Sequence, residues 1–228
     1  MRSLVFDTGS IISLTLNNVV WILDPLKERF KGNFYVTPEA KKELIERPLT
    51  MRRFEFEALQ TMTYFKKNTL EVLSNKEIED MSYRLLDLAN HSYRSNGNYL
   101  TLVHKADMEG LAAAIIQKAD AYVVDERTTR WLIEKPNSLR KMLSSRLNSR
   151  IEIDRKNLDE FRELAGNIRF LRSIELVYIA YKLNMLDSFK PDMPNGDKIL
   201  LDGLLWGMKL KGCAISKDEI KAIEHLEK

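Results

Sequence analysis

The chain has 228 residues, of which 44% are hydrophobic and 30% charged, with a formal net charge of +3. This size and composition favour one domain, or one domain with an extension, and exclude a disordered chain. The single cysteine, Cys213, excludes an internal disulfide and a cysteine-based zinc site. We expect a cytoplasmic protein without a membrane span, because residues 1–3 carry no signal-peptide pattern and charges interrupt the apolar run 168–183.

The first apolar run, Leu4 to Phe6, predicts a buried strand that ends at Asp7, with a helix opening near Ser10. Further apolar, β-branched or aromatic runs predict strands at 34–37, 70–73, 119–124 and, as a last edge strand, 150–154. Helices are predicted at 11–17, 20–30, 38–45, 51–67, 76–94, 108–118, 128–133 and 137–147. Strands that alternate with helices predict an α/β fold, a parallel sheet with helices on both faces, over residues 1–154.

From residue 157 onward the pattern is helical only, with helices predicted at 158–169, 173–184, 198–211 and 217–226. We therefore expect residues 155–228 to form an all-helical C-terminal extension. Ser216 and Glu219 have the spacing of a capping box at the start of the last helix. The helix at 198–211 is so apolar that it is expected to be buried in the domain or in a homodimer interface.

Acidic residues gather at one edge of the predicted sheet. Asp7 and the pair Asp125 and Glu126 follow strands, Asp107 opens a helix, and Glu43 lies in the helix that Thr37 and Pro38 begin. Alone, Asp7 would be interpreted as a helix cap. Several carboxylates in one cleft repel one another and stay ionised together beside a divalent cation, for which oxygen ligands select Mg²⁺ or Mn²⁺. A water activated by such a metal predicts phosphodiester hydrolysis.

Four segments resemble, in order and spacing, the motifs of the PIN-domain nucleases, and the resemblance covers about residues 1–153. They are Phe6-Asp7-Thr8-Gly9-Ser10, Pro38 to Leu44, Ala106 to Ala114 and Ala121 to Arg127. The resemblance implies a PIN-like fold and a metal-dependent endoribonuclease, either a VapC-like toxin with an antitoxin as protein partner or an RNA-processing enzyme. It also implies that Asp7, Glu43, Asp107 and either Asp125 or Glu126 are the metal-binding acids. The family often has Thr where this chain has Val124, which leaves the fourth acid open.

Several nearby residues are candidates for substrate binding. Thr8 and Ser10 would contact a metal-bound water or only cap the first helix. Arg127 and Arg130 would bind the scissile phosphate or form surface salt bridges. Residues 127–156 hold nine Lys or Arg and three acids, which suits either an RNA backbone or a solvated face.

A different class of function remains open, a catalytically silent module that binds RNA or protein through the same fold. The four acids argue against it. A phosphorylated signalling domain lacks its paired acid after the first strand, and an Asp-x-Asp phosphatase is excluded by Asp7-Thr8-Gly9.

Overall fold

A five-stranded parallel sheet lies at the centre of the computed structural model, which describes residues 2–226. The strand order is β3-β2-β1-β6-β8, and every neighbouring pair is parallel. The strands are β1 (Ser3–Phe6), β2 (Asn33–Val36), β3 (Glu71–Val72), β6 (Ala121–Val123) and β8 (Phe170–Leu171). The predicted α/β class and parallel sheet are confirmed.

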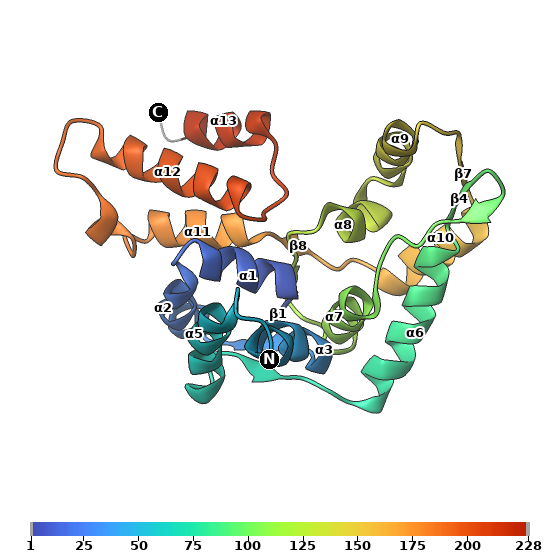
Figure 1. The fold of residues 1–228 in the computed structure, drawn as a ribbon, viewed down its shortest axis with the longest axis horizontal. Helices are drawn as coiled ribbons and strands as arrows, with labels where there is room; N and C mark the ends of the chain where they lie inside the picture. The colour runs from blue at the N-terminus through green and yellow to red at the C-terminus, as the bar shows by residue number, and fades with distance from the viewer. Residues whose placement is uncertain (1, 227–228) are drawn as a thin grey trace.

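Helices cover both faces of this sheet (Figure 1). Along the first two thirds of the chain they are η1 (Val20–Ile22), the π-helix η2 (Lys42–Glu46), α1 (Thr8–Leu16), α2 (Leu23–Phe30), α3 (Pro38–Lys41), α4 (Arg47–Leu49), α5 (Glu55–Lys66), α6 (Lys76–Asn90), α7 (Lys105–Ile116), α8 (Arg127–Glu134) and α9 (Pro136–Leu147). The side chains of β1 alternate between two hydrophobic clusters. Leu4 and Phe6 pack with Ile11 of α1 on one face, and Val5 packs with Leu111 of α7 on the other. Burial on both faces explains why β1 is an uninterrupted apolar run.

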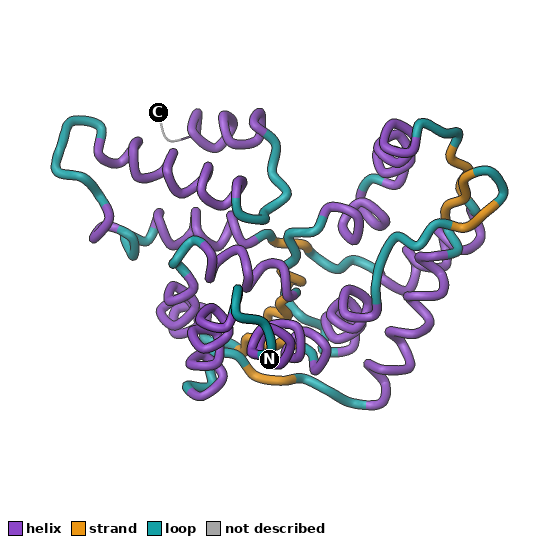
Figure 2. The backbone as a smooth tube through the Cα atoms, viewed as in Figure 1, coloured by secondary structure: helices purple, strands orange, loops and turns teal. Residues whose placement is uncertain are grey.

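The strand predicted at 150–154 is present, but its place at the edge of the main sheet was wrong. It forms β7 (Ile151–Ile153) in a separate antiparallel sheet of order β5-β4-β7, with β4 (Tyr93–Ser95) and β5 (Asn98–Tyr99). A hairpin turn at Asn96 and Gly97, with φ of 50° and 82°, joins β4 to β5. This small sheet and α9 lie on the opposite side of the molecule from the C-terminal helices (Figure 2).

The fifth strand of the main sheet comes from the region expected to be all-helical. After α10 (Arg155–Ala165), β8 pairs with β6, and Val124 donates from its backbone N–H to the Leu171 carbonyl at 2.8 Å. Two residues are too short for a period of 2 to be recognised, so this strand is hidden in the sequence. The sheet therefore extends beyond the boundary expected at 154/155, and the all-helical extension is corrected.

The remaining helices stack on α1 through α11 (Figure 1). They are α11 (Ser173–Lys182), η3 (Asp187–Phe189), α12 (Gly196–Leu210) and α13 (Lys217–Leu226). Leu201 and Leu205 of α12 are buried in the same hydrophobic cluster as β1, so this helix is packed within the chain. The predicted capping box of α13 is present, with Ser216 and Glu219 bonded reciprocally at 2.8 and 3.1 Å. None of the helices within residues 2–226 is long and apolar enough to span a lipid bilayer.

Candidate functional site

Asp7 is placed at the carboxyl edge of the sheet by β1 and by the start of α1. It caps α1, with Oδ2 accepting the Gly9 N–H at 3.0 Å, and its own N–H donates to the Val123 carbonyl at 2.9 Å. The side chain is buried, and burial, together with the charges of Asp107 and Asp125, raises the pKa of Asp7 to about 7. The pKa of an ordinary helix-capping Asp is not raised in this way, because the hydrogen bonds that it accepts favour the charged carboxylate.

Asp107 comes to the same edge from the first turn of α7. Its Oδ2 accepts the His104 N–H at 2.8 Å, which fixes the side chain at the helix start. Burial raises the pKa of Asp107, and the charges of Glu126 and Glu43 raise it further. The hydrogen bond from the His104 N–H lowers this pKa but does not offset the rise. Asp7 is thus a buried carboxylate and Asp107 a half-buried one, and their negative charges repel each other.

Asp125 already accepts two hydrogen bonds from a single residue, Ser173. Its buried carboxylate accepts the Ser173 N–H at 2.8 Å and the Ser173 hydroxyl at 2.6 Å. These bonds join the end of β6 to the start of α11. Asp125 therefore adds negative charge beside Asp7 while its oxygens serve the fold.

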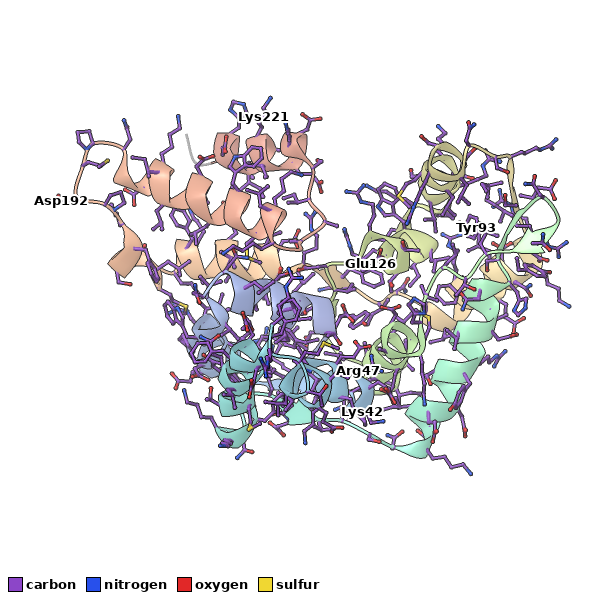
Figure 3. The ribbon with its side chains drawn as sticks, in the orientation of Figure 1. Lys42, Arg47, Tyr93, Glu126, Asp192 and Lys221 are labelled. Carbon is purple, nitrogen blue, oxygen red and sulfur yellow. The ribbon has the colours of Figure 1, made fainter. Side chains whose placement is uncertain are left out.

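Glu126 lies at the start of α8 and caps that helix (Figure 3). Its carboxylate accepts the backbone N–H of Thr128, the Thr128 hydroxyl at 2.9 Å and the Thr129 N–H at 3.1 Å. It is exposed, and its charge acts on Asp107. Of the two residues left open by the sequence, Glu126 is the one near Asp107 and Asp125 the one near Asp7.

Glu43 belongs to the π-helix η2, where the sequence predicted an ordinary α-helix. It pairs with Arg47 at 3.0 Å, and its charge acts on Asp107. The i→i+5 bonds of a π-helix change which side chains share a helical face. Glu43 thus contributes charge to the acidic group while it is paired with Arg47.

Asp7 and Asp107 are the pair that fits a metal ion best. Among residues 2–226, no three or more His, Cys, Asp or Glu side chains are arranged as a ready-made metal cage. Mg²⁺ does not require one, since it is usually bound by one or two carboxylates and keeps several waters. The repulsion between Asp7 and Asp107 fits a hydrated cation at this edge, and the buried Oγ1 of the neighbouring Thr8, which has no hydrogen-bond partner among residues 2–226, is open to a ligand.

The other predicted substrate-binding residues separate into two kinds. Ser10 is fully buried and donates to the Asp7 carbonyl at 2.7 Å, which serves the first turn of α1. Arg127 lies over the Trp131 ring at 5.0 Å. Arg130 has a buried Nε without a hydrogen-bond partner in the described chain, and burial and then the charge of Arg172 lower the pKa of its guanidinium. The guanidinium of Arg130 therefore has an unpaired donor that an anionic ligand would satisfy.

Two residues that support the site were missed in the sequence. Ser173 holds Asp125, and the fully buried Tyr122 donates to the Asp107 carbonyl at 3.3 Å. Ser173 is 48 positions from its partner, and nothing local marks such a pair. A comparison with protein families, curated proteins and solved structures finds no match to this chain. The chemistry of the site therefore rests on its side chains.

Proposed function

We propose that this protein is a metal-dependent endoribonuclease with a PIN-like domain, in which Asp7 and Asp107 hold Mg²⁺ or Mn²⁺. The observation that carries the proposal is the pair of opposing carboxylates at the carboxyl edge of a parallel sheet, with the pKa of Asp7 raised to about 7. Open α/β sheets bind their ligands at this edge. A cation there would supply an activated water and stabilise the charge that develops on a phosphodiester under attack.

The residues around the pair have separate roles in this proposal. Glu126 and Glu43 add negative charge around Asp107, which favours a cation over a bare acid pair. Asp125 fixes β6 against α11, so that the edge keeps its shape. Arg130, whose Nε is unpaired, would bind the phosphate of the substrate.

RNA is supported as the substrate by the basic residues of 127–156. They are Arg127, Arg130, Lys135, Arg140, Lys141, Arg146, Arg150, Arg155 and Lys156. None of the nine forms an ion pair with an acid of residues 2–226. A pocket of about 240 Å³ is lined by Arg140, Lys141, Ser144 and Arg150. Unpaired cations in a concave site fit the phosphates of a nucleic-acid backbone.

A silent binding module is the second candidate, and the structure gives it one argument. Asp125, Glu126 and Glu43 each already have a partner, namely Ser173, the start of α8 and Arg47. Asp7 and Asp107 also accept one backbone N–H each, from Gly9 and His104. A site of such structural carboxylates would bind RNA through the basic residues without cutting it. The two candidates therefore differ in cleavage, not in binding.

The test is cleavage of single-stranded and structured RNA with Mn²⁺ or Mg²⁺, by wild type and by Asp7→Asn and Asp107→Asn. Asp80→Asn is the matched control, since Asp80 is an exposed acid on α6. The proposal expects metal-dependent cleavage that both site variants abolish and the control retains. RNA binding without cleavage by wild type would favour the binding module, and cleavage that survives both substitutions would overturn the proposed site. A toxin and a processing enzyme would then differ in which RNAs are cut.

A further inference from the structure

A pocket of about 370 Å³ lies between α1, η2, α4 and α5. Two of its lining residues link it to the acidic pair: Thr8 directly follows Asp7, and the charge of Glu43 acts on Asp107. The rest of its lining includes Ile12, Met51, Phe54 and Ala58. The pocket was not predicted from the sequence, because its walls come from four separate helices and the turn between α4 and α5.

The pocket combines an apolar body with a few polar atoms. Ile12, Met51 and Phe54 are large apolar side chains that stay 40%, 53% and 36% exposed. Exposed apolar side chains around a concavity are typical of binding sites rather than of a bare surface. Thr8 is only 7% exposed, yet its Oγ1 has no hydrogen-bond partner within the described chain. A buried hydroxyl left unpaired is costly, so an occupant that pairs with it is favoured.

We propose that this pocket binds one unstacked nucleobase of the RNA, next to the phosphate held at Asp7 and Asp107. This inference rests on the proposed nuclease function and names the part of the substrate that the site recognises. A base has a flat apolar face for Met51 and Phe54 and a polar edge for the Thr8 hydroxyl. An apolar peptide side chain would fill the pocket but leave the Thr8 hydroxyl unpaired.

Glu57 indicates which bases fit best. It lines the pocket from α5, and its carboxylate has no hydrogen-bond partner among residues 2–226, whereas its backbone carbonyl accepts from Thr61 at 2.9 Å. An ionised carboxylate only accepts hydrogen bonds, so it pairs with an exocyclic amino group. Adenine, guanine and cytosine carry that group and uracil does not. Arg47 also lines the pocket, but it is paired with Glu43 at 3.0 Å. Glu57 therefore makes the pocket prefer these three bases to uracil.

Binding is tested without cleavage, by methyl NMR of the full chain with added nucleoside monophosphates. We expect AMP, GMP and CMP to shift the methyl signals of Ile12, Met51 and Ala58, UMP to shift them least, and Ile199 on α12 to stay unchanged. Glu57→Gln should abolish the preference over UMP. Ala58→Met, which fills the pocket, should remove the shifts. Equal shifts with ribose 5-phosphate, which has no base, or shifts with an apolar peptide alone, would overturn the proposal.

Cleavage gives the second arm, with RNA that carries an abasic nucleotide at successive positions around the cut. We expect a fall of about tenfold at one position, which corresponds to the loss of one stacked base. The Ala58→Met variant should cleave all of these abasic RNAs at the same rate. If no abasic position affects cleavage and no methyl signal shifts, the base-binding proposal is wrong and the proposed nuclease function is retained. Methyl shifts with no cleavage of any RNA would refute the nuclease and support the pocket.

Discussion

Ser173 donates two hydrogen bonds to Asp125, one from its backbone N–H at 2.8 Å and one from its hydroxyl at 2.6 Å. Both residues are buried, and hydrogen bonds to a charged carboxylate are stronger than bonds between neutral groups. They connect β6, which borders the acidic pair, to α11, on which the C-terminal helices stack. The C-terminal region is thereby tied to the candidate site through one carboxylate.

Ser173→Ala should lower the free energy of unfolding by about 1–3 kcal/mol, because a buried carboxylate oxygen loses its donor. Urea denaturation of wild type and variant measures the change. Ser145→Ala is the control, since Ser145 is exposed on α9, and its effect should stay within about 0.5 kcal/mol. Equal effects of the two substitutions would show that the Ser173 hydroxyl contributes nothing to Asp125.

Gly110 of α7 is required because Tyr122 packs against it. A Cβ at Gly110 would meet the Tyr122 Oη at 2.4 Å and Cζ at 2.9 Å, so Gly110→Ala should destabilise the fold by about 1–3 kcal/mol. Gly203 on α12 has nothing within 4 Å, and Gly203→Ala should instead stabilise by about 0.5–1 kcal/mol. Thermal unfolding shows whether each variant is more or less stable than wild type. A Gly110→Ala variant more stable than wild type would contradict the close contact between Gly110 and Tyr122.

The basic residues should determine how RNA binding depends on salt. Arg140→Ala, Lys141→Ala and Arg150→Ala should each weaken binding of single-stranded RNA and reduce the slope of log K against log salt by roughly 0.7. Lys66→Ala, an exposed cation on α5, should leave the slope unchanged. Fluorescence anisotropy at a series of salt concentrations gives the slopes. A slope that none of the three substitutions alters would place the RNA elsewhere.

Glu219 should make stability sensitive to acid. Burial opposes ionisation, but hydrogen bonds from Ser216 and Arg172 prevail and lower the pKa of Glu219 to about 2. Because the folded pKa lies below the unfolded one, this stabilisation is present above about pH 4.5 and is lost as the pH falls towards 2. Half of the side chain is exposed, so we expect about 1 kcal/mol at most.

Unfolding measured from pH 7 to pH 3 should therefore show a smaller loss in Glu219→Gln than in wild type. Glu224→Gln, on the same helix, is the comparison variant. If wild type and Glu219→Gln lose stability in parallel, the Arg172 pairing does not contribute.

The sequence predicts elements best where a local pattern fixes them. The buried run at Leu4 to Phe6 is β1, and Thr37 caps the helix that Pro38 begins, with the Ala40 N–H bonded to the Thr37 hydroxyl at 3.3 Å. Local patterns do not say which strands pair. The strand at Ile151–Ile153 has the expected alternation but joins a different sheet.

The acidic group was predicted because strand ends must share an edge in a parallel sheet, and this holds for Asp7 and Asp125. The hydrogen-bond or ion-pair partner of each acid could not be predicted from the sequence. The Ser173 partner depends on β8, a strand of two residues, and Glu43 lies in a π-helix where an α-helix was predicted. Both are set by tertiary packing rather than by local propensity.

If Asp7 and Asp107 hold a divalent cation, titration calorimetry with Mn²⁺ at about pH 8, where Asp7 is ionised, detects it directly. Wild type and the Asp80→Asn control should bind Mn²⁺ at one site with equal affinity. Asp7→Asn and Asp107→Asn should each weaken that binding by at least about tenfold. No binding by wild type, or equal binding by all four proteins, would contradict the account.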